Sequence, residues 1–275
     1  MKIFTPDFNL EATLESGQVF GFRRTPGGAF EGTLYWHRAK LRQVRDRLLV
    51  ESDSAGLGVS LVKNYFDLEQ DLTSFYTILR RDKRLIPLYR RFKGLRIIRQ
   101  EAWEALACFI LSSNNNVKRI QRIWRNLADY FGKETLESPA VFPKPLALAR
   151  SHERVLRFLG LGYRAPFLYR TAHFLAASPQ YLGVIREAGY AEAKTRVLEF
   201  PGIGEKVADC VLLYGFQKYE AFPVDVWIAR AMKKLYFKNR PVPEKRIRDF
   251  ARNRWGERAG YVQQYLFHGA RLGVV

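Results

Sequence analysis

The pattern of apolar and polar positions changes partway along the chain. Before about residue 90, segments 29–44 and 47–52 place β-branched and aromatic residues near a period of two, and glycine-containing turns at 25–28 and 53–56 interrupt them. Alternation bounded by turn residues predicts short antiparallel strands. Residues 71–82 show helical spacing instead. The first part is therefore expected to contain a small antiparallel sheet and some helix.

After about residue 93, the apolar positions recur every three or four residues, which predicts amphipathic helices. Most of these segments end at glycine or follow serine, proline or aspartate, as helix ends prefer. The expected fold is α+β, with an N-terminal antiparallel sheet domain over residues 1–92 and a helical domain over residues 93–275. The main predicted helical segments are 101–113, 117–132, 151–160, 205–216, 224–237, 244–256 and 260–273.

The net charge of the chain indicates which class of partner it binds. Its 275 residues include 46 lysines and arginines against 27 aspartates and glutamates, which leaves a net charge of +19. An excess of this size attracts a polyanion through counterion release, so nucleic acid is the leading partner. A generally basic surface is the plainer alternative. A membrane surface is a weaker one, because no basic amphipathic anchor stands out.

Two absences in the sequence narrow the setting. No window approaches eighteen unbroken apolar residues, and the first residues lack the apolar core of a signal peptide. We therefore expect no membrane segment. A nucleic-acid partner implies an intracellular location with the DNA, in the cytoplasm or nucleoid of a prokaryote or the nucleus of a eukaryote. The cysteines are Cys108 and Cys210. Two thiols cannot supply a four-cysteine zinc or iron–sulfur site, so no iron–sulfur cluster and no required cofactor is expected.

The stretch LEFPGIGEKVADCVLLYG, from Leu198 to Gly215, predicts a helix end, a tight turn and a second helix. This arrangement is a helix-hairpin-helix. Gly202 and Gly204 permit positive φ and a close backbone approach. Free N–H groups at the start of the second helix would then form a seat for phosphate on any nucleic-acid strand. A plain glycine-containing loop between helices is the alternative.

Lys206 stands at the start of the second helix, where its charge opposes the helix dipole. The dipole and partial burial both favour the neutral amine, which is a nucleophile able to form a Schiff base. A surface lysine that contacts phosphate explains the position equally well. Nineteen residues on, Asp225 precedes another helix, either as its N-cap or as an acid facing Lys206. As an acid it would stabilise positive charge at a sugar carbon and shuttle a proton.

The run from Phe200 to Asp225, with PGIGEKVADC and FPVDV, resembles the signature of base-excision DNA glycosylases of the helix-hairpin-helix (HhH-GPD) superfamily. Within it, nearly the whole chain is similar to 8-oxoguanine DNA glycosylase/AP lyases of the eukaryotic type. The resemblance implies that Lys206 attacks C1′ of the damaged nucleotide, that Asp225 assists, and that the imine permits β-elimination. It also implies a TATA-binding-protein-like N-terminal domain and, as partner, duplex DNA containing 8-oxoguanine. We expect the protein to act as a monomer.

The resemblance also assigns a pocket for the damaged base. Gly17, in ESGQVFGF, matches a glycine whose carbonyl accepts the N7 hydrogen that 8-oxoguanine carries. Guanine would instead face that carbonyl with a second acceptor. Cys210 and Phe267 match positions on the two faces of the base, and Gln263 matches the position that reads its Watson–Crick edge. Without the resemblance, Gly17 is interpreted as a turn, and Cys210 and Phe267 as core residues.

Two further motifs match residues that act on the opened duplex. By the resemblance, Asn114 in LSSNNNVKRI fills the vacated space, and Tyr163 in LGLGYRAPFLYR wedges beside the unpaired base. Arg119 and Arg164 match residues that hydrogen-bond the estranged cytosine. Guanidinium donors suit the O2 and N3 acceptors of cytosine, which predicts a preference for cytosine opposite the lesion. The alternatives are an elaborate N-cap at the asparagines and a packed turn at Tyr163.

The hairpin itself carries two backbone sites by the same resemblance. DNA phosphate is expected on the backbone of Gly202, Gly204 and Val207. A structural, non-catalytic cation is expected on the carbonyls of Leu198, Phe200 and Ile203.

One position departs from the family pattern. Two residues after Asp225 the family commonly has a histidine that touches a phosphate, whereas this chain has Trp227. An indole N–H donates one hydrogen bond without a charge, so we expect a weaker or rearranged phosphate contact. Two rival functions stay open: a glycosylase for other, alkylated bases, and a non-catalytic DNA clamp.

Overall fold

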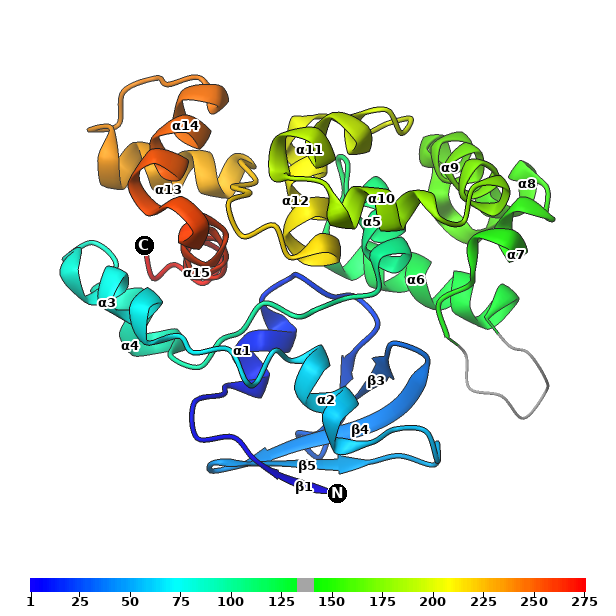
Figure 1. The fold of residues 1–275 in the computed structure, drawn as a ribbon, viewed down its shortest axis with the longest axis horizontal. Coiled ribbons are helices and arrows are strands. Elements are labelled where there is room, and N and C mark those ends of the chain that lie inside the picture. Colours follow the sequence, from blue (N-terminus) through cyan, green and yellow to red (C-terminus); the bar gives the residue numbers. More distant parts are fainter. Residues whose placement is uncertain (133–140) are drawn as a thin grey trace.

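The protein consists of a five-stranded antiparallel sheet followed along the chain by a body of helices (Figure 1). A computed structural model describes residues 1–132 and 141–275. The predicted α+β class, with the sheet domain before the helical domain, is confirmed. The strands are β1 (Lys2–Phe4), β2 (Arg23–Arg24), β3 (Phe30–Leu34), β4 (His37–Val44) and β5 (Arg47–Glu51).

The helices divide into a short early group and a longer later one. The early helices are α1 (Leu10–Glu15), α2 (Val59–Tyr65), α3 (Thr73–Arg81) and α4 (Ile86–Phe92). The later helices are α5 (Ala102–Leu111), α6 (Val117–Phe131), α7 (Pro145–Ala149), α8 (Glu153–Leu156), α9 (Ala165–Ala177), α10 (Tyr181–Glu187), α11 (Tyr190–Leu198), α12 (Glu205–Phe216), α13 (Val226–Tyr236), α14 (Glu244–Trp255) and α15 (Ala259–Arg271). In the described part of the chain, no helix has the length and apolar character needed to cross a bilayer.

The strands are ordered β1-β5-β4-β3-β2, and every neighbouring pair is antiparallel. The predicted strand segment 29–44 is divided into β3 and β4 by a two-residue turn, because Leu34 pairs with His37. Tyr35 in that turn has a φ of +53°, the left-handed conformation that such a tight hairpin requires. Leu34, Leu41 and Leu48 are buried on the face of the sheet that packs against α2.

Helices α3 and α4 pack with the helical body, although they lie in residues 1–92 of the sequence. The ring of Phe75 lies 5.1 Å from that of Tyr261, and the ring of Phe92 lies 4.5 Å from that of His268. Figure 1 shows α3 and α4 beside α15, away from the sheet. The predicted boundary between residues 92 and 93 stays a prediction.

Helices α5 and α12 form the centre of the helical body. All the residues of α12 from Val207 to Phe216 are buried, as are nine of the ten residues of α5. The two helices approach closely where Gly215 faces Ala105: a Cβ on Gly215 would lie 3.0 Å from the Ala105 Cβ. Because α12 is enclosed along its length, its first turn is the part that reaches the surface.

The Gln18 side chain joins the loop after α1 to the segment that enters the helical body. It is fully buried. Its amide nitrogen donates to the carbonyls of Thr13 (3.0 Å) and Arg96 (2.9 Å), and its amide oxygen accepts from the Ile98 N–H (2.8 Å). Gln100 donates to the Gln18 carbonyl at 2.7 Å. The loop that carries Gly17 is therefore held by buried hydrogen bonds on its far side.

Replacing Gln18 by methionine keeps the volume of the side chain but leaves the Arg96 carbonyl and the Ile98 N–H buried without partners. We expect the free energy of unfolding to fall by about 3 kcal/mol, since each orphaned group costs about 1–3 kcal/mol. Urea unfolding measures this loss. The control is Gln121→Met, because Gln121 has no hydrogen bond within the described residues; its effect should stay within about 0.5 kcal/mol. Equal losses in the two variants would contradict the role of the Gln18 amide.

Candidate active site and DNA interface

The predicted hairpin connects α11 to α12. Gly202 has a φ of +78°, and a Cβ on it would lie 2.4 Å from the ring of Phe167, so conformation and space both require glycine. Gly204 is the N-cap of α12, and no side chain caps that helix. The first N–H groups of α12 are therefore left to solvent or to an anion, which is the arrangement expected of a phosphate seat.

Lys206 is the second residue of α12 and is half-buried. Its Nζ donates to the hydroxyl of Ser112, at the end of α5, over 3.4 Å. The amine lies on the wall of a cavity of about 500 Å³, which we call the base cavity. The other predicted catalytic and base-pocket residues that line this cavity are Gly17, Cys210, Asp225, Gln263 and Phe267. The fold thus brings six predicted residues, from four separate segments, to one hollow.

Asp225 is the N-cap of α13, as one of the two interpretations of its position predicted. Its Oδ1 accepts from the Ile228 N–H at 2.8 Å. This hydrogen bond fixes the direction of the carboxylate while the residue still lines the base cavity that Lys206 also lines. Capping and an acid–base role are therefore compatible, because the cap occupies one oxygen and orients the group.

Cys210 lies one helical turn after Lys206 and is buried. Burial raises the pKa of its thiol to about 12, against an opposing attraction from the Lys206 charge. The thiol is therefore neutral near pH 7 and offers an apolar, polarisable surface to the cavity. Cys108, the other cysteine, is also buried, and burial raises the pKa of its thiol too.

Gln263 and Phe267 project from successive turns of α15 into the base cavity. The Gln263 amide nitrogen donates to the Pro223 carbonyl at 3.2 Å, and its amide oxygen accepts from the Tyr214 hydroxyl at 3.4 Å. These contacts hold the amide in a defined orientation. Phe267 is half-buried, so one part of its ring packs and the rest faces the cavity.

Gly17 forms the edge of the same cavity with a φ of +81°. A Cβ there would lie 3.1 Å from Cε1 of Phe267 and 2.7 Å from Nη1 of Arg271. The positive φ agrees with the plain interpretation of ESGQ as a turn. The absence of a side chain lets the backbone of that turn reach the wall of the cavity, so the turn and a binding role coincide.

The loop between α5 and α6, which contains Asn114, is contacted by Tyr163 and Arg164. The Tyr163 hydroxyl donates to the Ser113 carbonyl at 3.1 Å, and Arg164 donates to the Ser113 carbonyl at 2.9 Å and the Asn114 carbonyl at 2.8 Å. Tyr163 is 50% exposed, whereas Arg164 is buried. The Arg164 guanidinium therefore holds the loop backbone, a contact that the sequence did not predict. Its assignment to the estranged cytosine stays a prediction.

The three asparagines divide their roles. Asn116 is the N-cap of α6, with its Oδ1 accepting from the Arg119 N–H at 3.0 Å. Asn115 donates to the Leu111 carbonyl at 2.9 Å. Asn114 has a φ of +47°, is exposed, and has no side-chain hydrogen bond within the described residues. The capping interpretation is therefore right for Asn116, and Asn114 is left available for another partner. Arg119 is exposed on the first turn of α6.

Two expectations stay predictions: the cation on the hairpin carbonyls and the altered phosphate contact at Trp227. The Phe200 carbonyl already accepts from the Ile203 N–H at 3.3 Å. Among the residues that the structure describes, no group of three or more His, Cys, Asp or Glu side chains is arranged to hold a metal ion. Trp227 lines the base cavity and is 40% exposed, and the Arg230 guanidinium lies 6.0 Å from its ring. A positive charge is thus near the indole, although the indole has none.

Three residues at the site were missed by reasoning from the sequence: Ser112, Gln18 and Arg271. Ser112 was part of the asparagine motif but seemed only a capping residue. Gln18 lies within ESGQVFGF, where no sequence pattern indicates a role, and only its burial in the fold shows one. Arg271 stands one turn after Phe267, so the i, i+4 spacing that joined Gln263 to Phe267 was the signal that pointed to it.

Two family models match the chain. The 8-oxoguanine DNA glycosylase, N-terminal domain, matches residues 2–106, and the HhH-GPD superfamily base excision DNA repair protein matches residues 107–256. A probable N-glycosylase/DNA lyase of Methanothermobacter thermautotrophicus is 34% identical over 98% of this chain and 96% of its own length. An N-glycosylase/DNA lyase of Arabidopsis thaliana is 28% identical over 97% and 78%.

A solved structure gives the same likeness in three dimensions. It is the Clostridium acetobutylicum 8-oxoguanine glycosylase/lyase in complex with double-stranded DNA containing cytosine opposite 8-oxoguanine. The two chains share 30% identity and superpose with a TM-score of 0.92, over 100% of this chain and 99% of the other.

The raised pKa of Cys210 gives a chemical prediction for this site. Only the thiolate reacts with iodoacetamide, and a pKa of about 12 leaves roughly one thiol in ten thousand ionised at pH 8. We expect alkylation of Cys210 in the native protein to be at least about a hundredfold slower than in guanidinium-denatured protein, as followed by peptide mass spectrometry. Cys210→Ala identifies the signal. Native Cys210 that reacted as fast as the denatured thiol would contradict its enclosure.

Proposed function

The chain belongs to the HhH-GPD superfamily of base excision DNA repair proteins, and from this premise we propose that it excises 8-oxoguanine from duplex DNA and then cleaves the strand. The observation that carries the proposal is the base cavity, whose wall holds an amine, a carboxylate and a set of base-reading groups. Relatives with N-glycosylase/DNA lyase and 8-oxoguanine glycosylase/lyase activities match nearly the whole chain. The substrate is double-stranded DNA, so the protein acts inside the cell, with the DNA.

The chemistry begins at Lys206. Its neutral amine donates an electron pair to C1′ of the extruded nucleotide as the bond between C1′ and the base nitrogen N9 breaks. The departing base keeps the bonding pair and takes up a proton. The bond between C1′ and O4′ then breaks, O4′ keeps the bonding pair and takes up the proton that the amine nitrogen loses, and a Schiff base forms between Nζ and C1′. Removal of a proton from C2′ expels the 3′ phosphate and nicks the strand.

Asp225 acts beside this step. A carboxylate held by the first turn of α13 stabilises the positive charge that develops at C1′ and moves protons to and from the reacting groups. The role is supported by its place on the wall of the cavity that also contains Lys206. The Ser112 hydroxyl, which accepts from Nζ, orients the amine before the nucleotide arrives.

The base is read by the remaining groups of the cavity. Phe267 and the neutral Cys210 thiol lie against its two faces, and the oriented Gln263 amide reads its Watson–Crick edge. The Gly17 carbonyl accepts the N7 hydrogen of 8-oxoguanine, which guanine lacks. The proposal is supported by the shared cavity and by the backbone at Gly17 reaching its wall.

The duplex is gripped outside the cavity. The uncapped start of α12, at Gly202, Gly204 and Val207, takes a phosphate, and the carbonyls of the same hairpin hold a structural cation. Asn114 fills the space left by the extruded base, with Tyr163 wedged beside it. Arg119 and Arg164 donate to the estranged cytosine. Asn114 and Arg119 are exposed on the loop before α6 and on its first turn, and the exposed Tyr163 donates to the Ser113 carbonyl of that loop; this arrangement supports the assignment.

The rival functions differ from the proposal at identifiable residues. A glycosylase for alkylated bases has no use for an acceptor aimed at an N7 hydrogen, and Gly17 and Gln263 argue against it. A non-catalytic clamp needs the hairpin but neither an amine nor a carboxylate in a cavity. A panel of duplexes with different lesions separates the first rival from the proposal, and covalent trapping separates the second.

Lys206→Gln should abolish the crosslink that borohydride traps on an 8-oxoguanine:cytosine duplex, because the glutamine amide cannot form a Schiff base. Asp225→Asn should lower single-turnover excision about 10²- to 10⁴-fold, the range of acid–base contributions. Lys118 also lines the base cavity, so Lys118→Gln is the matched control and should keep the crosslink. Loss of the crosslink in Lys118→Gln alone would move the nucleophile to that residue, and no crosslink in the wild-type protein would favour the clamp.

We expect excision of 8-oxoguanine to be faster opposite cytosine than opposite the other three bases. Arg119→Ala should reduce that preference about tenfold, the loss of one charge-assisted hydrogen bond of about 1.5 kcal/mol. Arg119 is the sharper choice than Arg164, since removing the Arg164 guanidinium also releases the Ser113 and Asn114 carbonyls. Single-turnover rates on the four duplexes test both points. Equal rates in the wild-type protein would defeat the proposed cytosine preference.

A further inference from the structure

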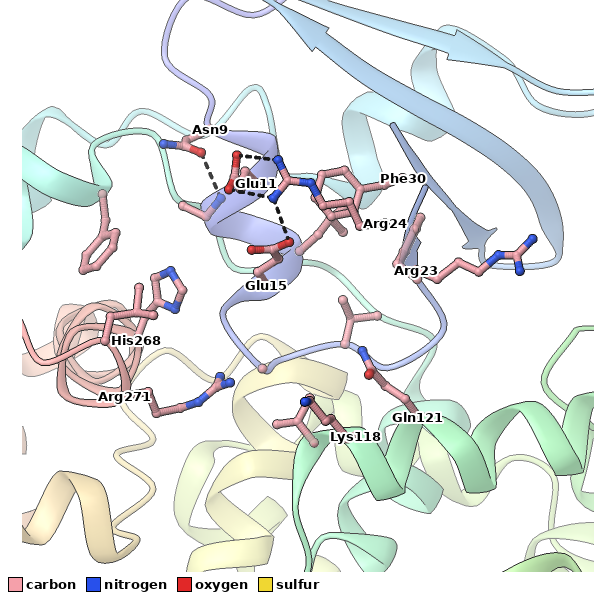
Figure 2. Close-up of a pocket in the computed structure, with 18 of the residues that line it drawn as sticks. Asn9, Glu11, Glu15, Arg23, Arg24, Phe30, Lys118, Gln121, His268 and Arg271 are labelled. Atoms are coloured by element: carbon pink, nitrogen blue, oxygen red, sulfur yellow. Dashed lines mark hydrogen bonds and ion pairs between the residues drawn. The ribbon is translucent and has the colours of Figure 1, made fainter. Parts of the chain in front are cut away.

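A second cavity, of about 660 Å³, lies behind the Gly17 loop, and we call it the outer cavity. It is bounded by α1, the start of β3, α6 and the end of α15 (Figure 2). Gly17, Val117, Lys118 and Arg271 line both this cavity and the base cavity. The Gly17 backbone and the Arg271 side chain therefore form part of the partition between the two hollows.

Arg271 is the last residue of α15, and its guanidinium is packed against this partition. Nη1 lies 2.7 Å from the place where a Gly17 Cβ would be, and the guanidinium carbon lies 5.4 Å from the centre of the Phe267 ring. Figure 2 shows the side chain extending from α15 toward the loop after α1. The absence of a side chain at Gly17 leaves the space that the guanidinium occupies.

The Arg271 Nη1 is buried and has no hydrogen-bond partner among the described residues. Nor does Arg271 form an ion pair within that part of the chain. The two carboxylates that line the outer cavity, Glu11 and Glu15, pair with Arg24 at 3.0 Å and 3.5 Å, as Figure 2 shows. A buried guanidinium donor without an acceptor is costly. A ligand that brings an oxygen to this point would supply the missing acceptor.

The lining of the base cavity relates Arg271 to the proposed catalytic pair. Burial lowers the pKa of Arg271, and the Asp225 carboxylate acts in the opposite direction. Arg271 and Asp225 both line the base cavity, and the Gln263 amide on the same wall is held at the Pro223 carbonyl. Beside Gly17, Arg271 therefore lines the same hollow as the proposed catalytic pair.

The covalent structure of a purine indicates which atom of the base Arg271 would contact. C8 is bonded to both N7 and N9, and N9 carries the sugar, so C8 is the neighbour of N7 on the side of the reacting C1′. With the Gly17 carbonyl at the N7 hydrogen, a donor that lines the same cavity directly beside Gly17 is placed to meet the substituent of C8. Resting on the proposed function, we propose that Arg271 is a specificity-determining residue that donates a hydrogen bond to the C8 oxygen of the extruded 8-oxoguanine.

The protein would then distinguish 8-oxoguanine from guanine at two neighbouring positions of the base, N7 and C8. 8-Oxoguanine presents a donor at N7 and an acceptor at C8, which match the Gly17 carbonyl and the Arg271 guanidinium. Guanine presents an acceptor at N7 and a C–H at C8, so it mismatches the first group and leaves the second unpaired. A site that leaves its buried polar groups unpaired rejects the wrong ligand strongly. Arg271 thus reads the oxygen that defines the lesion.

The test measures binding separately from chemistry. Duplexes that carry 2′-fluoro-2′-deoxy-8-oxoguanosine or 2′-fluoro-2′-deoxyguanosine opposite cytosine resist excision, so their Kd values report recognition alone. Arg271→Met should weaken binding to the 8-oxoguanine duplex about tenfold to a hundredfold, as for a hydrogen bond to a charged group, and binding to the guanine duplex less than threefold. Arg271→Lys, which keeps a charged donor, should recover part of the loss.

A second measurement separates base reading from an effect on catalysis. On a duplex with a natural abasic site there is no C8 oxygen to contact, so the fold-loss in excision caused by Arg271→Met should exceed its fold-loss in abasic strand cleavage at least tenfold. Equal losses would overturn the proposal, because Arg271 would then act through Asp225, through Lys206 or through the fold. Equal weakening of the two 2′-fluoro duplexes would overturn it as well.

The matched control is Arg91→Met. Arg91 lines the outer cavity but not the base cavity, so its loss changes the charge nearby without touching the base. It should leave the preference for 8-oxoguanine over guanine unchanged, and an equal loss of preference in this variant would reduce Arg271 to a general charge effect and defeat the proposal. If the wild-type protein itself showed no preference between the two duplexes, the proposed function would fail first, which is a different result.

Discussion

The buried amide of Gln18 is the contact on which the site depends. Its nitrogen and its oxygen both form hydrogen bonds that join the loop after α1 to the Arg96–Ile98 segment, and the side chain is fully buried, so water does not compete for these bonds. The adjacent Gly17 is thereby presented to α15 from a rigid backing, because a fully satisfied buried amide has one favourable orientation. Recognition that rests on a backbone carbonyl requires this rigidity, since a mobile loop would accept either N7 state of the base.

Helix α12 connects the fold to the chemistry. Its length from Val207 onward is buried, so its uncapped first turn is the part that reaches both the surface and the base cavity. Lys206 stands at that border, half-buried and within hydrogen-bond distance of Ser112 on the neighbouring central helix. One packed pair of helices, α5 and α12, thus fixes the amine and the loop that holds Asn114. A shift of α12 relative to α5 would displace the Lys206 amine relative to the loop that holds Asn114.

The charges that attract DNA over long distances differ from the groups that line the base cavity. The net charge of +19 draws in DNA regardless of sequence, whereas the groups inside the base cavity are few and mostly neutral. The thiol of Cys210 is kept uncharged by burial, and the charges of the cavity wall are Lys118, Lys206, Asp225 and Arg271. Lys206, Asp225 and Arg271 are half-buried, so their charges are screened less than those of exposed residues.

The sequence alone determined the features that depend on contacts within short stretches of the chain. The hairpin with Gly202, the caps at Asp225 and Asn116, and the α+β order follow from hydrogen bonds and backbone conformations within a few residues. The family resemblance added Gly17, which no local pattern distinguishes from an ordinary turn. Only the tertiary structure decided that α3 and α4 pack with the helical body, that Arg164 is buried on loop carbonyls, and that Arg271 stands unpaired at the partition. Long polar side chains take their roles from whatever packing brings within their reach, and that information is spread over the whole chain.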